Sequence, residues 1–303
     1  MQLEVRNITK SFGDKEVLHG VSFTVESGRA MGFLGRNGAG KSTTIRCLMD
    51  VFKQDSGGFY LDGKPLQVKK YRVGYLPEER GMYSKHHVLD QLVYFARLRG
   101  ASKEDALRSA NYWVDYFELG DFKKKKMETL SKGNQQKIQI AQSFLNEPDI
   151  LILDEPFSGL DPVNAQVFKN AISQFVAQGK LVIFSSHQMG YVEEVCDDVT
   201  LIHEGSIRLT GDLQQIKREM GENKLQLRIE GLEDEDLARA LQAQFPALQT
   251  QHHEDGLILD TQNQVSQQQI LAFVSGQGWT IRSFGLYTPS LNDIFLAKVG
   301  EHA

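Results

Sequence analysis

The chain has few cysteines and no long apolar run. Its two cysteines, Cys47 and Cys196, form no CxxC pair and have no histidine cluster nearby, so we expect neither a disulfide framework nor a zinc site. A reducing compartment suits this usage. No stretch reaches about 18 consecutive apolar residues, and the first residues carry charges instead of an apolar leader. We therefore expect a soluble chain, whose role at a membrane, if any, depends on a partner.

An excess of basic charge is also lacking. The formal net charge is -5 and the pI is about 5.9, which argues against neutralisation of nucleic-acid phosphates as the main task. We expect no nucleic-acid partner. The 303 residues, 41% of them hydrophobic, suffice for one large core or two moderate ones. We predict two domains, residues 1–221 and 222–303.

The first domain shows the pattern of a mixed α/β fold. Its start alternates as β-strands do, and the apolar run 30–34 leads through a glycine-rich loop into a helical pattern. Two further apolar runs, 150–153 and 180–184, flank a helix over about 163–178, which is the pattern of parallel strands. Helical periodicity over 88–119 indicates a helical insertion.

The second domain follows a predicted linker, Gly221 to Asn223. Its elements are close to the order β-α-β-β-α-β with one strand unseen, so we predict a small α+β, ferredoxin-like domain. The run from His252 to Asp255 could suggest a metal site, but a solvated hairpin turn is the better interpretation. We hypothesise that this domain stabilises or regulates a dimer, which deletion of residues after Gly221 would test.

The strongest chemical motif is the segment Gly35–Ser42, which matches G-x-x-x-x-G-K-[ST] between a predicted strand and helix. In such a P-loop, backbone N–H groups converge on phosphate oxygens, Lys41 reaches the β and γ phosphates, and the Ser42 hydroxyl ligates Mg²⁺. A chance glycine-rich turn is the weaker alternative. The residues assigned to nucleotide contact are Gly35, Arg36, Asn37, Gly38, Ala39, Gly40, Lys41, Ser42 and Thr43. The expected ligands are ATP and Mg²⁺.

Two carboxylates follow the apolar run 150–153. Asp154 would lie at the strand end beside the P-loop, where it can hold Mg²⁺ directly or through water. Glu155 can polarise the attacking water as a general base. An exposed Asp-Glu-Pro turn would be the better interpretation of these residues alone, but the upstream P-loop favours catalysis.

The segment Leu130–Gln136 resembles the LSGGQ signature of ABC ATPases, with Lys132 and Asn134 as departures. The resemblance implies that Ser131 and Gly133 contact the γ-phosphate of an ATP held by the opposite subunit. Without the P-loop and the carboxylates in the same order, Ser-Lys-Gly would be an ordinary helix cap.

Other positions fit the same family pattern. The resemblance implies that segment 158–161 is a D-loop, that His187 is the switch histidine that contacts the γ-phosphate, and that Phe12 stacks on adenine. A core phenylalanine is the alternative for Phe12. Glu78 occupies the position of the family's Q-loop glutamine, and its carboxylate could ligate Mg²⁺ or a water.

The resemblance covers about residues 1–215 and implies a catalytic Glu155, aided by Lys41 and His187, in an ATPase that drives transport. Two copies would enclose two ATP molecules head to tail, and an integral membrane permease would bind near Glu79, Arg80 and Tyr83. Segment 74–81 and the C-terminal addition resemble the sodium-exporter-like ATPases of bacterial ABC-2 type export systems.

This subfamily implies an exporter motor in the cytoplasm, peripheral on the inner face of the cell membrane. A soluble ABC ATPase that acts on ribosomes or DNA is the first alternative. A nucleotide-sensing regulator with little turnover is the second.

Overall fold

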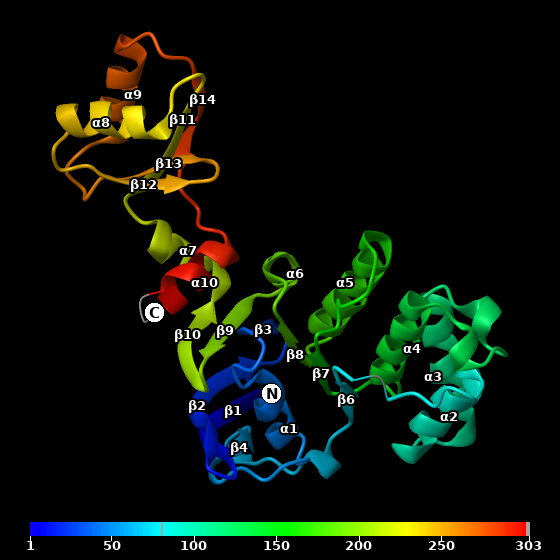
Figure 1. The fold of residues 1–303 in the computed structure, drawn as a ribbon. Helices are drawn as coiled ribbons and strands as arrows, with labels where there is room; N and C mark the ends of the chain where they lie inside the picture. The colour runs from blue at the N-terminus through cyan, green and yellow to red at the C-terminus, as the bar shows by residue number, and fades with distance from the viewer. Residues whose placement is uncertain (80, 301–303) are drawn as a thin grey trace. The chain divides into compact units, whose positions relative to one another are not determined.

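A computed structural model describes residues 1–79 and 81–300, and the chain divides into two compact units (Figure 1). Unit 1 comprises Met1–Leu213 with a return of the chain from Lys298, and unit 2 comprises Gln214–Ala297. The division at Leu213 lies before the boundary of 221 predicted from the sequence. Gly221 ends a helix whose backbone lies against the Tyr287 carbonyl, so this helix packs with the second unit.

Unit 1 contains two sheets. The antiparallel sheet has the order β2-β1-β4-β5, and the larger sheet has the order β10-β9-β3-β8-β7-β6. In the larger sheet β10 runs antiparallel to β9, while the other neighbouring pairs are parallel. This arrangement confirms the mixed α/β fold with a β-rich start. The strands are β1 (Gln2–Phe12), β2 (Lys15–Glu26), β3 (Ala30–Leu34), β4 (Ser56–Leu61), β5 (Lys64–Pro65), β6 (Val73–Leu76), β7 (Ile150–Asp154), β8 (Leu181–Ser186), β9 (Asp198–His203) and β10 (Ser206–Asp212).

The central strands β3, β7 and β8 are buried at every position, which explains their continuous apolar sequences. The side chains of Leu3, Val5, Phe23 and Phe33 fill the space between the two sheets, with the Phe23 and Phe33 ring centroids 5.1 Å apart. This core fixes the end of β3, from which the glycine-rich loop leaves.

Three helices belong to the α/β part and three to the helical insertion, whose helix α4 lies beside β6 and β7 in Figure 1. An aromatic group joins the insertion to the rest of unit 1, since the Phe144 ring lies 4.7 Å from both Trp113 and Phe175. The helices are α1 (Lys41–Leu48), α5 (Pro162–Ala177) and α6 (Met189–Val195), then α2 (Val88–Leu98), α3 (Lys103–Tyr116) and α4 (Lys132–Phe144), with short 3₁₀ turns at 68–70, 120–122 and 127–129.

Unit 2 contains an antiparallel sheet of order β12-β13-β11-β14, and two helices lie between its strands in the sequence β-α-β-β-α-β. The strand that sequence analysis did not find is β12, because its residues Gln-Thr-Gln-His-His are polar and largely exposed. The elements are α7 (Leu213–Gly221), β11 (Lys224–Ile229), α8 (Asp234–Gln244), β12 (Gln249–His253), β13 (Gly256–Asp260), α9 (Gln267–Gly276), β14 (Ile281–Leu286) and α10 (Leu291–Gly300).

His252 and His253 lie on β12, and Glu254 and Asp255 form the turn to β13. Residues 1–79 and 81–300 contain no group of three or more histidine, cysteine or acidic side chains arranged to hold a metal. The pairing of β12 with β13 across this turn confirms the predicted hairpin. In the same part of the chain, no helix combines the length and the apolar character that crossing a membrane requires.

Candidate nucleotide-binding site

The glycine-rich loop connects the carboxyl end of β3 to the first residue of α1. Gly38 and Gly40 have φ values of 81° and 112°, in the left-handed region that favours glycine. At Gly40 a Cβ would also lie 2.7 Å from the Leu18 side chain. The loop therefore has a fixed shape that these glycines permit, and it leads into the N-terminus of a helix, where N–H groups favour an anion.

Lys41 is the first residue of α1, and its ammonium group is buried against the loop. Its Nζ donates to the Gly35 carbonyl at 2.6 Å and to the Arg36 carbonyl at 3.3 Å. The same Nζ lies 3.8 Å from Glu155 Oε1. The Lys41 ammonium group is thus held between the loop and the carboxylate of Glu155, which follows β7.

Asp154 ends β7 and is buried, and its Oδ1 accepts a hydrogen bond from the Ser185 hydroxyl at the end of β8. Its other oxygen, Oδ2, has no hydrogen-bond partner, and the same is true of Glu155 Oε1. A buried carboxylate oxygen without a partner is costly. A cation or a water between the two carboxylates would compensate both, so the residues present fit Mg²⁺ and an ordered water.

Glu155 has a positive φ of 50°, which turns its side chain out of the line of β7. Its Oε2 lies 2.9 Å from His187 Nδ1, and its backbone N–H donates to the Ser185 carbonyl at 3.1 Å. The structure therefore brings Glu155 and His187 together next to Lys41, and sequence analysis assigned all three to catalysis. Ser185, to which sequence analysis assigned no role, bonds the Asp154 carboxylate through its hydroxyl and accepts from the Glu155 backbone N–H.

A cavity of about 370 Å³ lies over the loop. Glu78, from the segment after β6, and Glu155 form part of its wall, so the predicted Q-loop position does face the P-loop. Asp154 is not part of this wall, and Val17, which sequence analysis did not name, adds an apolar side chain to it. The complete lining is Val17, Arg36, Asn37, Gly38, Gly40, Lys41, Ser42, Thr43, Glu78 and Glu155.

The predicted signature forms the start of α4. The Ser131 hydroxyl caps the helix by accepting from the Asn134 N–H at 3.3 Å, and a Cβ on Gly133 would lie 3.7 Å from the Gly159 carbonyl of the predicted D-loop. Neither Ser131 nor Gly133 lines the cavity. Gln136, one turn further on, donates to the Pro156 carbonyl at 3.3 Å and so joins α4 to the segment after Glu155.

Phe12 lies outside the cavity lining and is 45% exposed. Its ring packs edge-on against Phe52 at 5.4 Å, and Lys10 Nζ lies 5.3 Å from its centroid. A core position, the alternative from the sequence, is therefore wrong. An exposed aromatic ring is available for stacking, and adenine contact stays a prediction.

A glycine-rich loop between a parallel strand and a helix, with a buried lysine and two carboxylates at the carboxyl end of a second parallel strand of the same sheet, defines a P-loop nucleoside-triphosphate site. Comparison with known proteins refines this class. Residues 18–158 match a family described as ABC transporter, and residues 211–299 match one described as the C-terminal domain of DrrA1-3-like ATP-binding proteins.

The chain is 42% identical over 299 residues to the uncharacterized ABC transporter ATP-binding protein YhaQ of Bacillus subtilis, which covers 98% of both chains. It is 34% identical to the Nod factor export ATP-binding protein I of Burkholderia lata, over 67% of this chain and 68% of that one. A solved structure of an ATP-binding subunit of an ABC transporter superposes with a TM-score of 0.68 at 30% identity, over 73% of this chain and 94% of that one.

These similarities confirm the resemblance predicted from the signature. The chain belongs to the ATP-binding proteins of ABC transporters, with the C-terminal domain of the DrrA1-3-like type and relatives of the ABC-2 exporter kind. It is therefore an ABC ATPase cassette, in a family whose members bind and hydrolyse ATP.

Proposed function

We propose that the chain is the motor subunit of an ABC exporter, which dimerises around two ATP molecules and drives a separate membrane permease. The observation that carries this proposal is a pair of buried carboxylate oxygens that lack a hydrogen-bond partner, Asp154 Oδ2 and Glu155 Oε1, the second of which lies 3.8 Å from Lys41 Nζ beside the P-loop cavity. They suit a metal ion and a water next to a triphosphate. A nucleotide sensor without turnover would still use Asp154 for the metal but would not need the Glu155 carboxylate as a general base.

In this proposal the loop N–H groups bind the phosphates, and Lys41 leaves the Gly35 and Arg36 carbonyls to pair with the β and γ phosphates. Ser42 and Asp154 hold Mg²⁺, with Glu78 as a third candidate ligand. The metal neutralises charge on the phosphate oxygens. An additional carboxylate at Glu78 lies in the same cavity wall, which would strengthen attraction for the metal and weaken it for the triphosphate.

For hydrolysis, Glu155 accepts a proton from water as the water oxygen bonds to the γ-phosphorus. The bond from that phosphorus to the β–γ bridging oxygen breaks, and ADP and phosphate leave. His187 orients the carboxylate through the 2.9 Å contact between Nδ1 and Oε2, which leaves Nε2 to contact the γ-phosphate.

Dimerisation follows from the position of Ser131 and Gly133, which do not line the cavity of their own chain. If they bind a γ-phosphate, it must be that of a second copy. Closure of the dimer then depends on ATP and opening on hydrolysis, because the γ-phosphate contacts exist only while ATP is bound.

Export fits the relative whose printed name includes Nod factor export. The permease would bind the segment around Glu79 and Tyr83 next to α2, with Arg80 outside the described residues. In this arrangement the chain would lie on the cytoplasmic face of the membrane, held there by its partner.

The test of the enzyme is Glu155→Gln, with the exposed Glu104→Gln on α3 as the matched control. Loss of the general base should lower steady-state phosphate release about 10²–10⁴-fold, whereas the control should match the wild type. Turnover unchanged by Glu155→Gln would remove this residue from the proposed role.

The same variant tests the partner. Tagged Glu155→Gln protein, expressed in its native host and extracted gently with ATP present, should hold the closed dimer and retain a multi-span membrane protein identifiable by mass spectrometry. Recovery of ribosomal or DNA-bound proteins, with none from the membrane, would make a soluble ABC ATPase the better account.

A further inference from the structure

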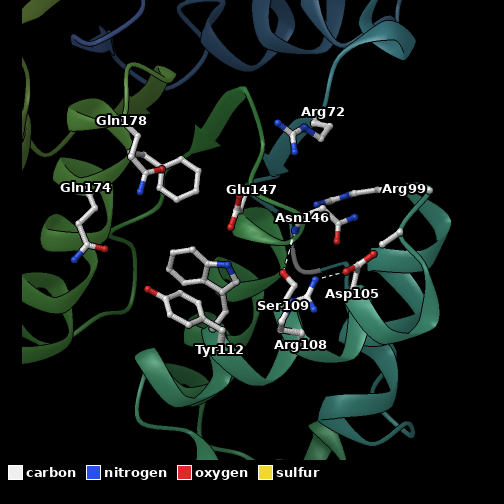
Figure 2. Close-up of a pocket in the computed structure, with 14 residues that line it drawn as sticks. Arg72, Arg99, Asp105, Arg108, Ser109, Tyr112, Asn146, Glu147, Gln174 and Gln178 are labelled. Carbon is white, nitrogen blue, oxygen red and sulfur yellow. Dashed lines mark hydrogen bonds and ion pairs between the residues drawn. The ribbon is translucent and has the colours of Figure 1, made fainter.

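A second cavity of about 540 Å³ lies in unit 1, larger than the one over the P-loop (Figure 2). Its walls come from the ends of α2 and α5, one side of α3 from Asp105 to Trp113, and the segments that precede β6 and β7. No residue lines both cavities. Its volume is within the range of small-molecule sites, about 300–1,000 Å³.

The position of this cavity separates it from nucleotide chemistry. Arg72 directly precedes β6, and Asn146 and Glu147 precede β7, so they lie at the amino edge of the parallel strands. Asp154 lies at the opposite, carboxyl edge of β7. We name this second cavity, lined by Arg72, Arg99 and the other residues of Figure 2, the amino-edge pocket.

Three arginines and two carboxylates line the amino-edge pocket. Arg108 pairs with Asp105, which is on its own helix. Arg72 pairs with Asp149, at 2.8 Å between Nη2 and Oδ1, and Glu147 adds to the rise in the pKa of the Arg72 guanidinium. The two carboxylates of the lining, Asp105 and Glu147, thus interact electrostatically with Arg108 and Arg72.

Arg99 differs from the other two. Its Nη1 donates to the Gln142 carbonyl at 2.9 Å, and across the described residues 1–79 and 81–300 it has no ion pair with a carboxylate. Burial lowers its pKa, and no acidic neighbour offsets that effect. A guanidinium keeps its charge at neutral pH, so this cation is partly desolvated without a counter-ion.

The remaining wall supplies apolar and amide groups. Trp113 and Phe175 line the pocket with largely buried rings, 4% and 3% exposed and 5.9 Å apart between centroids, and Tyr112 is 55% exposed. The buried Oδ1 of Asn146 has no hydrogen-bond partner. In Figure 2 the labelled Arg99, Arg108 and Arg72 lie on one side of the view, and Gln174 and Gln178 on the other.

We propose that the amino-edge pocket binds a small organic anion, with a carboxylate on the Arg99 guanidinium and a flat apolar body against Trp113 and Tyr112. The unpaired charge selects for an anionic group, and the aromatic wall selects against a bare inorganic ion. A planar, bidentate carboxylate is the group that guanidinium geometry recognises best.

Trp113 provides a direct readout, because the chain has one other tryptophan, Trp279, in unit 2. In the full-length Trp279→Phe protein, with ADP added to fill the P-loop, phenylacetate is titrated while Trp113 fluorescence is recorded. Phenylacetamide, which has the same shape without the charge, and inorganic phosphate are the matched ligands. Calorimetry on the same samples gives Kd independently.

We expect saturable binding of phenylacetate, with phenylacetamide and inorganic phosphate weaker by at least about tenfold. Arg99→Gln should abolish the preference for the acid over the amide, Arg99→Lys should keep part of it, and the exposed Arg97→Gln on α2 should leave it intact. Circular dichroism and ADP binding confirm that each variant is folded.

Three results would overturn the proposal. One is the absence of saturable phenylacetate binding to the folded protein. The second is equal affinity for the acid and the amide, and the third is an unchanged acid preference in Arg99→Gln. None of these depends on ATP turnover, so the outcome is independent of the function proposed above.

Discussion

The parallel sheet of unit 1 has a cavity at each edge, and the two differ in how the sequence builds them. At the carboxyl edge, nine of the ten lining residues are polar, charged or glycine, and seven of the ten come from the continuous segment 36–43. At the amino edge, the lining comes from five separate segments between Arg72 and Gln178. A local motif therefore specifies the first cavity, whereas packing of distant elements creates the second.

The largest expected effect is at the carboxyl edge. Lys41→Met removes the buried cation that we place on the β and γ phosphates, so phosphate release should fall about 10²–10³-fold, as for other single electrostatic contacts of this kind. Lys53→Met, on an exposed loop, is the matched control. Equal ATP turnover of Lys41→Met and Lys53→Met would show that Lys41 does not act on the phosphates as we propose.

Two glycines of the loop test whether its shape is locally encoded. In Gly38→Ala the added methyl group meets no atom within 4 Å. The left-handed φ should therefore be the only cause of lost stability, about 1–2 kcal/mol in the free energy of unfolding. Gly40→Ala adds a clash at 2.7 Å with Leu18, for a total of about 2–4 kcal/mol. Urea unfolding, followed by Trp113 fluorescence in the Trp279→Phe background, measures both. If both variants lost the same free energy of unfolding, packing against Leu18 would not determine the shape of the loop.

The smallest effect is at the amino edge. Hydrogen bonds from Arg72 and then Lys180 lower the pKa of Asp149 below its ordinary 3.8, so its contribution to stability is complete above about pH 4 and is lost as pH falls through the lowered pKa. Asp149→Asn should reduce the free energy of unfolding by about 1 kcal/mol or less at pH 7.

The pH dependence of this variant sharpens the test. Between pH 7 and the acid range, the stability of Asp149→Asn should fall less steeply than that of the wild type, in the same fluorescence assay. Asp121→Asn, which is exposed, should follow the wild type. If the free energy of unfolding changed with pH in the same way in Asp149→Asn and the wild type, the Arg72–Asp149 ion pair would not stabilise the amino edge of the sheet.

The particular failures of sequence analysis have physical causes. The strand β12 escaped notice because it lies at the sheet edge with polar residues and lacks an apolar alternation. The boundary at 221 was placed at a glycine, but that glycine is held against the Tyr287 carbonyl, and no local signal reports such a long-range contact. The hydrogen bond from Gln136 to the Pro156 carbonyl likewise has no local sequence signal, although both residues lie in segments that sequence analysis discussed.

The sequence by itself determined the P-loop, the apolar strand that precedes Asp154 and Glu155, and the family signature, because each is a run of neighbouring residues with a fixed spacing. Only the tertiary structure decided which oxygens of Asp154 and Glu155 lack a hydrogen-bond partner, and that the half-buried Arg99 has no ion pair with a carboxylate within residues 1–79 and 81–300. Those properties depend on segments far apart in the chain, and a charge or hydrogen bond is satisfied or left open only when these segments pack together.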